Sequence, residues 1–187
     1  MPKLSPSTLY KKVYSYRLRK LAPATRHAKW NDVRVPPAVA DKRRIIDGVL
    51  PPGKRIDYAQ SEGGEVESHK EYTNTGDTVV IIGGGRGVSA VHAARQVGSN
   101  GSVVVYEGAE KYANIIRETA GLNSVSDRVQ VNHALVGPTI DIAGDQGGAD
   151  TVSPQKLPDC DVLEMDCEGA ERDILAGMDI RPRVMII

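Results

Sequence analysis

The chain has few cysteines, no phenylalanine and no long apolar run. Of its 187 residues only Cys160 and Cys167 are cysteines, which excludes a disulfide scaffold and a four-ligand zinc site. No stretch approaches about 18 consecutive apolar residues and no basic-then-apolar leader opens the chain, so we expect neither a membrane span nor a signal peptide. The expected protein is therefore reduced and cytoplasmic.

The chain also lacks net charge. Its 24 basic and 24 acidic residues cancel, which excludes a uniformly basic nucleic-acid binder, and we expect no nucleic-acid partner. The charges are unevenly placed, because residues 1–30 carry eight basic residues and no acidic one. This segment is either a solvated lead or a weak contact for an anionic surface such as a lipid headgroup layer, and both interpretations stay open.

The sequence divides into three stretches of different composition. Residues 1–50 form a basic extension interrupted by prolines, with an amphipathic helix predicted over 7–21. Residues 51–75 are polar and contain glycines, which is typical of a connector with short elements at most. Residues 76–187 alternate strand and helix patterns and are predicted to be the folded core.

The core is predicted to be an α/β domain. Residues 78–82 are a continuous β-branched run, which is typical of a strand buried on both faces. Helical periodicity follows this run and recurs between the later strands, so we expect a mostly parallel sheet with helices on both faces. Residues 138–159 are rich in Gly, Asp and Pro, and this stretch is long enough to suggest function or disorder. The other strands are predicted at 102–106, 128–132, 161–165 and 183–187.

A glycine-rich turn follows the first strand of the core. Glycines let a ligand approach the backbone closely, and the helix that follows offers free N–H groups at its N-terminus. Glu107 comes 24 residues after Gly83, at the end of the second strand, where an acid can accept hydrogen bonds from both ribose hydroxyls of an adenosine. The alternatives are a tight turn that holds nothing and a solvated carboxylate. The candidate cofactor-binding glycines are Gly83, Gly84, Gly85 and Gly87.

Two classes of cofactor share this pattern. Gly85, Gly87 and Ala90 satisfy the G-x-G-x-x-A pattern of FAD- and NAD-binding proteins, which alone is a weak signal. Residues 98–103, however, resemble the turn before the second strand of class I S-adenosylmethionine (SAM)-dependent methyltransferases, and residues 123–136 resemble their third strand and the loop that borders adenine. This resemblance adds His133 and Ala134, which would border the adenine, to the candidate cofactor-binding residues.

The segment 161–171, Asp-Val-Leu-Glu-Met-Asp-Cys-Glu-Gly-Ala-Glu, closely resembles the signature of the FkbM-type O-methyltransferase family. The resemblance covers about residues 68–187. It implies a Rossmann-like fold with strand order 3-2-1-4-5 for the strands present, SAM as the cofactor, and methyl transfer to a hydroxyl of a sugar, glycan or other small molecule. The open alternatives are an FAD- or NAD-binding Rossmann protein and a catalytically inactive nucleotide-binding module.

The chain departs from the family pattern at two positions and at its end. Ile81 stands where the family usually has an acid that contacts the methionine part of the cofactor, and Glu164 stands where it often has Lys. The family also continues with further strands, whereas this sequence stops at Ile187 in the fifth strand. We therefore expect either a longer native polypeptide or another chain that covers this end, because an exposed apolar strand end invites aggregation.

The candidate catalytic residues follow the fourth strand. Asp166 and Glu168 would lie outside the carboxyl end of the sheet, where either could act as a base, position the acceptor or, for Asp166, bind the cofactor. Glu168 and Glu171 could instead simply favour a helix N-terminus. The acids between 161 and 171 suggest a magnesium site, but strand alternation sends them to different faces, so no metal ligand is predicted and metal dependence stays open.

Overall fold

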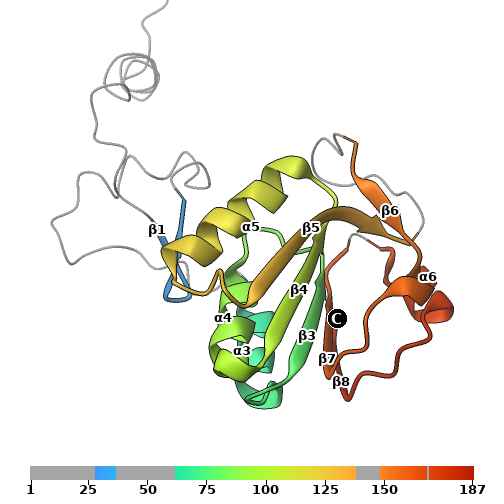
Figure 1. Ribbon diagram of the computed structural model, residues 1–187, viewed down its shortest axis with the longest axis horizontal. Coiled ribbons are helices and arrows are strands. Elements are labelled where there is room, and N and C mark those ends of the chain that lie inside the picture. The colour runs from blue at the N-terminus through green and yellow to red at the C-terminus, as the bar shows by residue number, and fades with distance from the viewer. Residues whose placement is uncertain (1–27, 37–61, 138–147, 168) are drawn as a thin grey trace, which may run out of the picture.

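The structure, a computed structural model, describes residues 28–36, 62–137, 148–167 and 169–187. Its main feature is a six-stranded sheet in which all neighbouring strands pair in parallel (Figure 1). The predicted order of the five core strands is confirmed. In spatial order the strands are β6 (Asp150–Val152), β5 (Val129–Val136), β4 (Ser102–Glu107), β3 (Thr78–Ile82), β7 (Val162–Met165) and β8 (Val184–Ile186).

The strand β6 was not predicted. It lies in the stretch 138–159 and pairs with the second half of β5, in register from Ala134 to Val136. β5 itself runs four residues past its predicted end, because β6 supplies a hydrogen-bonding partner for that half. A single helical turn, η4 (Pro154–Lys156), follows β6, and Leu157 after it is buried. The described part of this stretch is therefore an edge of the sheet.

Both faces of the sheet are covered, as predicted. Val79 and Ile81 of β3 pack into one apolar cluster, and Val80 and Ile82 pack into another on the opposite face. This alternation explains why β3 reads as a continuous apolar run. The helices of the first face are α3 (Gly63–Tyr72), α4 (Val88–Val97), which continues into the turn η3 (Gly98–Asn100), and α5 (Glu110–Leu122); α6 (Glu171–Gly177) covers the second.

The first 75 residues were expected to hold a connector at 51–75 and no part of the folded core, and the structure differs on both points. The segment 51–75 was expected to hold short elements at most, but it contains the ten-residue helix α3, whose Val66 and His69 are buried. Within the N-terminal extension, β1 (Ala28–Trp30) and β2 (Val33–Val35) form an antiparallel hairpin. Val33 and Val35 are fully buried in the first cluster, so this hairpin is part of the core. The helix predicted over 7–21 lies outside the described residues.

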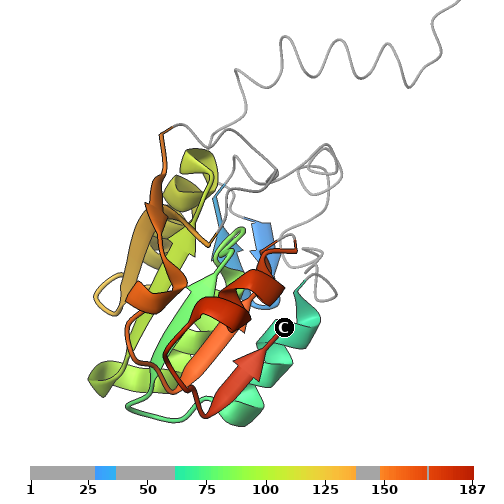
Figure 2. The same ribbon diagram turned by 90° about the vertical axis from the view of Figure 1, so that its right-hand side faces the viewer.

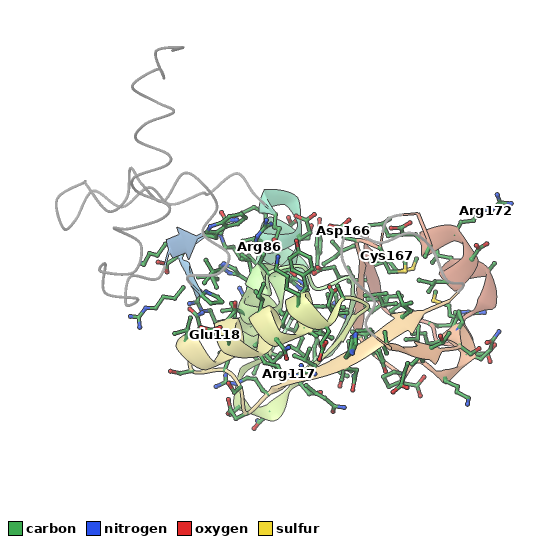
Figure 3. All side chains as sticks on the ribbon, turned by 90° about the horizontal axis from the view of Figure 1, so that it is seen from above. Arg86, Arg117, Glu118, Asp166, Cys167 and Arg172 are labelled. Atoms are coloured by element: carbon green, nitrogen blue, oxygen red, sulfur yellow. The ribbon has the colours of Figure 1, made fainter. Side chains whose placement is uncertain are left out.

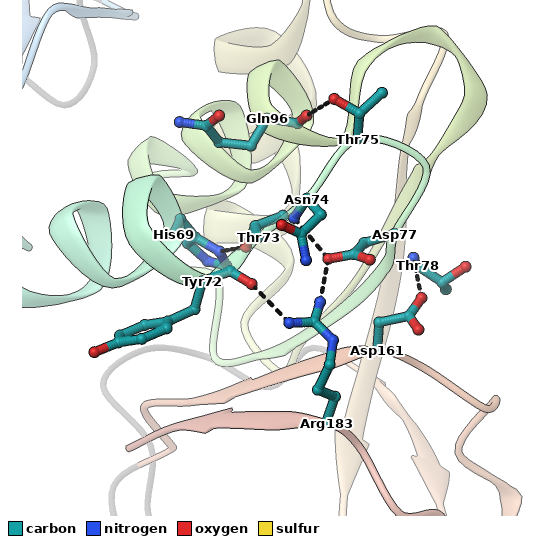
Figure 4. A network of polar contacts seen from close by, with 10 residues as sticks. All are labelled: His69, Tyr72, Thr73, Asn74, Thr75, Asp77, Thr78, Gln96, Asp161 and Arg183. Atoms are coloured by element: carbon teal, nitrogen blue, oxygen red, sulfur yellow. Dashed lines mark hydrogen bonds and ion pairs between the residues drawn. The ribbon is translucent and has the colours of Figure 1, made fainter.

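The amino ends of the strands are joined by polar contacts (Figure 4). Asp77 accepts a hydrogen bond from the backbone N–H of Asn74 at 2.7 Å and pairs with Arg183 at 2.6 Å. Arg183 also donates to the carbonyl of Tyr72, which ties the start of β8 to the end of α3 (Figure 2). This end of the sheet is therefore occupied by structural contacts, and the candidate site lies at the other end. None of the helices in the described ranges has the length and apolar content that crossing a membrane requires.

Candidate functional site

The predicted site residues gather where the connections from β3 and β7 leave the sheet in opposite directions. The chain after β3 turns into α4 on one face, and the chain after β7 turns toward α6 on the other. Open α/β sheets bind ligands at such a switch point, outside the carboxyl ends of the strands. The ends of β3 and β7 are held together here, because the N–H of Asp166 donates to the carbonyl of Ile82 at 3.0 Å. The N–H of Gly83 donates to the carbonyl of Tyr106 at 2.9 Å, which joins the end of β3 to β4.

Gly83 is required by the protein's own packing. Its φ of 88° lies in the left-handed region, and a Cβ at this position would overlap the backbone carbonyl of Asp166. Both observations exclude any other residue here. Gly83 therefore fixes how closely the turn after β3 approaches the turn after β7.

Gly84 and Gly87 are also explained by packing. A Cβ on Gly84 would lie 2.5 Å from Val105 Cγ1 and 2.7 Å from Ile116 Cδ1, and one on Gly87 would lie 3.2 Å from the Ile116 Cα. These glycines let α5 pack closely against the turn. Gly85 differs from them, because its Cβ position meets nothing closer than a carboxylate oxygen of Glu62 at 3.8 Å. Of the four predicted glycines, Gly85 is therefore the one whose Cβ position is unobstructed by the residues that the structure describes.

Glu107 is aimed at the glycine turn. It ends β4, is 7% exposed, and its Oε2 accepts a hydrogen bond from the N–H of Gly85 at 3.2 Å. Its Oε1 accepts from the N–H of Ala109 at 2.9 Å. Burial raises the pKa of Glu107, while these backbone hydrogen bonds and the charge of His133 act in the opposite direction. Each carboxylate oxygen can accept a further hydrogen bond, so the group can still bind a ligand hydroxyl.

His133 and Ala134 lie in β5, beside the end of β4. His133 is in register with Glu107, and its Nε2 lies 3.2 Å from the carbonyl oxygen of Gly108. Ala134 is 5% exposed. The structure thus brings Glu107, His133 and the glycine turn to one end of the sheet. His133 and Ala134 lie within the strand β5, whereas the resemblance predicted a loop that borders the adenine.

Asp166 is exposed directly after β7, and Figure 3 shows it with Arg86 and Cys167 along one edge of the molecule. Glu168 lies outside the described residues. Glu171 accepts a hydrogen bond from the N–H of Cys167 at 2.9 Å, the contact expected of an acid in the first turn of a helix. Burial and the neighbouring Glu171 raise the pKa of the Cys167 thiol to about 12, so Cys167 is not a nucleophile at neutral pH.

The other carboxylates between 161 and 171 have separate partners. Asp161 accepts a hydrogen bond from the N–H of Thr78 at 2.8 Å, at the amino end of the strands. Glu164 is 2% exposed and contacts His69 at 2.6 Å and Ser89 at 2.8 Å. In the described ranges no three His, Cys, Asp or Glu side chains could together hold a metal ion.

Sequence reasoning missed Glu62, which lies at the glycine turn from the start of α3. The backbone N–H of Ser89, in the first turn of α4, hydrogen-bonds to its carboxylate. Burial, followed by the charge of Glu164, raises the pKa of Glu62 to about 7. Nothing in the sequence near position 62 resembles a binding motif, so only the packing of α3 against α4 could place this side chain.

No protein-family model and no curated protein matches the chain. Among solved structures it is similar to a SAM-dependent O-methyltransferase from Thermotoga maritima, at 20% identity and a TM-score of 0.45, with 70% of this chain and 42% of that one covered. It is also similar to an O-methyltransferase from Bacillus cereus in complex with SAH, at 18% identity and a TM-score of 0.41, with 74% and 59% covered. A SAM-dependent methyltransferase from Aquifex aeolicus gives 20% identity and a TM-score of 0.42, with 67% and 57% covered.

The chain spans about half the length of the solved structures that it matches. At this level of identity, and with TM-scores of 0.45 or lower, the likeness assigns no activity. The function has to be argued from the residues of the site.

Proposed function

We propose that this chain is the cofactor-binding part of a class I SAM-dependent methyltransferase of the FkbM type, which transfers a methyl group to a hydroxyl oxygen of a sugar or other small molecule. The observation that carries the proposal is the position of Glu107. Its buried carboxylate ends β4 and touches the N–H of Gly85, at the switch point of a parallel sheet. This is where an acid binds the ribose hydroxyls of an adenosine cofactor.

The electrostatics of the turn favour SAM over a dinucleotide. NAD and FAD place a pyrophosphate at the N-terminus of the helix after the glycine turn. In this chain the carboxylate of Glu62 accepts the N–H of Ser89 at that helix end, and Glu164 adds a second acid nearby. A pyrophosphate would meet two acids there against the single cation of Arg86, whereas SAM carries a sulfonium and an ammonium group beside its carboxylate. The resemblance of residues 161–171 to the FkbM signature agrees with this choice.

The residues of the site have different roles in the proposed reaction. SAM supplies an electrophilic methyl group, so the protein has mainly to align the acceptor and remove one proton. Glu107 binds the ribose, and His133 and Ala134 border the adenine at the end of β5. Asp166 is exposed beside the turn and accepts the proton of the acceptor hydroxyl. Glu168, two positions further along the sequence, is a second candidate base.

Isothermal titration of the purified chain tests the cofactor. We expect binding of SAM and of its demethylated product S-adenosylhomocysteine (SAH), and no binding of NAD or FAD at the same concentrations. Binding of a dinucleotide without SAH would overturn the proposal in favour of a nucleotide-binding Rossmann protein. Binding of SAH without methyl transfer to any sugar or polyol would leave a cofactor-binding module and contradict the catalytic part.

A further inference from the structure

Glu62 is fixed at the glycine turn by the backbone of α3. Its φ of 58° and ψ of 30° place it in the left-handed region, which residues other than Gly, Asn and Asp rarely adopt. Its carbonyl accepts the first hydrogen bond of α3, from the N–H of Val66 at 3.1 Å. The helix therefore holds this uncommon conformation, which directs the side chain toward the turn after β3.

The carboxylate of Glu62 faces the open position beside Gly85. Its Oε1 lies 3.8 Å from where a Cβ of Gly85 would stand, and among the described residues outside Gly84 and Arg86 no other atom approaches that position as closely. Burial and the charge of Glu164 disfavour its ionised form, and Arg86 and the N–H of Ser89 offset this only in part. A carboxylate in such surroundings binds a cation favourably, because a nearby positive charge stabilises its ionised form.

Arg86 supplies a cation from the same turn, and its charge acts on Glu62. It follows Gly85 directly, and its guanidinium carbon lies 4.5 Å from the centre of the Trp30 ring. Stacking on an aromatic ring holds the planar guanidinium in place. Its carbonyl accepts the hydroxyl of Thr119 at 2.9 Å, so α5 fixes the backbone as well. The turn at Gly85 thus has an acid held by α3 and a cation held against Trp30, and the charge of Arg86 acts on Glu62.

We infer that Glu62 and Arg86 bind the amino-acid end of the cofactor, with Glu62 accepting hydrogen bonds from the ammonium group and Arg86 donating to the carboxylate. The inference rests on the proposed function, since it assumes a cofactor that carries an α-amino acid. A zwitterion is the ligand that suits an acid and a cation that both lie at the glycine turn. Glu62 would then perform the task of the acid that Ile81 replaces.

Two ligands that differ only at the amino-acid end separate this role from adenosine binding. SAH carries the ammonium and the carboxylate, and 5′-methylthioadenosine lacks both. Titration of each ligand into wild type, Glu62→Gln and Arg86→Gln measures the contribution of the pair. Glu67→Gln is the matched control, because Glu67 is an exposed acid of α3 that pairs with Lys70 on the surface.

We expect wild type to bind SAH at least about tenfold more tightly than methylthioadenosine. Glu62→Gln and Arg86→Gln should each weaken SAH binding by about tenfold or more and change methylthioadenosine binding by no more than about twofold. The control should bind both ligands as wild type does.

Each other outcome contradicts a different claim. If both variants weaken the two ligands equally, or weaken neither, the pair does not bind the amino-acid end, although the proposed function stands. If wild type binds neither ligand, the proposed function fails and the inference fails with it. Melting temperatures of the variants no more than about 4 °C below that of wild type would show that folding is intact.

Discussion

Glu164 and His69 share a hydrogen bond of 2.6 Å between Oε2 and Nε2, although 95 positions separate them in the sequence. Both side chains are buried, and the network extends to the Ser89 hydroxyl, 2.8 Å from Glu164, and the Thr73 hydroxyl, 2.9 Å from His69. The network joins β7 to α3 and α4 beneath the glycine turn. Glu164, which stands where the FkbM pattern often has Lys, is therefore the hydrogen-bonding partner of His69 in α3, a helix that the sequence did not predict.

This hydrogen bond predicts that Lys, which the FkbM pattern often has at this position, is not tolerated at position 164. Glu164→Lys should lower the free energy of unfolding by about 3–5 kcal/mol, because it buries an unpaired ammonium and leaves His69 and Ser89 without their acceptor. Glu164→Gln should cost only about 1–2 kcal/mol, since its amide oxygen still accepts one hydrogen bond. Urea denaturation of the two variants provides the measurement. A Glu164→Lys variant as stable as wild type would show that the network contributes nothing.

The glycine turn predicts two different effects of the same substitution. Gly83→Ala should prevent folding or cost more than about 3 kcal/mol, because its Cβ overlaps the Asp166 carbonyl in a left-handed conformation. Gly85→Ala should cost only about 1 kcal/mol, the strain of its φ of 50°, and should weaken SAH binding instead. Thermal denaturation and titration measure both. The reverse order of stabilities would contradict the packing argument.

Glu107 should contribute to binding more than to folding. Glu107→Gln retains the shape but replaces one acceptor oxygen by a donor, so we expect SAH and methylthioadenosine to bind about ten- to a hundredfold more weakly. Glu110→Gln, in the first turn of α5, is the control, because Glu110 is exposed. Loss of SAH binding with methylthioadenosine unchanged would refute the ribose assignment, since both ligands carry the same ribose.

Asp166 should affect turnover rather than cofactor affinity. Asp166→Asn keeps the size of the side chain but cannot accept a proton at neutral pH, so we expect methyl transfer to fall by about 10²–10⁴-fold. SAH affinity should stay within about threefold of wild type. Asp173→Asn, on an exposed position of α6, is the control. If Asp166→Asn weakens SAH binding in parallel with turnover, Asp166 binds the cofactor and is not the base.

The strands with runs of apolar residues were predicted from the sequence, and β6, which has no such run, was missed. β3 and β7 are buried almost throughout, and in β4 the buried Val103 and Val105 alternate with partly buried residues. β6 has the pattern Asp-Thr-Val with its first two residues exposed, and it forms only because β5 offers an edge. No local pattern marks such a strand.

The same limit explains what the sequence did and did not reveal about the site. Glu107 could be placed, because its spacing from Gly83 follows from one strand–helix–strand unit. Glu62 and His69 could not, because α3 buries only Val66 and His69 and therefore shows no apolar stripe. Their contacts with Gly85 and Glu164 depend on how α3 packs, which is a tertiary property.

The pH dependence of stability should depend on Glu62. Burial, and after it the charge of Glu164, raises the pKa of Glu62 from its ordinary value of 4.5 to about 7; Glu65 on α3 acts in the same direction, and Arg86 and the N–H of Ser89 act against it. Below pH 4.5 the carboxyl group of Glu62 is protonated in both the folded and the unfolded state, so it does not lower the free energy of unfolding. Between about pH 4.5 and 7 the unfolded chain releases a proton that the folded protein keeps, so the free energy of unfolding falls as the pH rises.

Glu62→Gln removes this loss, because the amide does not ionise. The stability of Glu62→Gln relative to wild type should therefore be greater at pH 8 than at pH 5, by about 2–3 kcal/mol at about 1.36 kcal/mol for each unit of pKa shift. Urea denaturation of both proteins at the two pH values measures the difference, and Glu67→Gln should show none. Saturating SAH should reduce the difference, because an ammonium group beside Glu62 stabilises its ionised form in the folded protein. A difference between variant and wild type that is the same at both pH values would mean that Glu62 is solvated, and the cation site at Gly85 would then lose its main support.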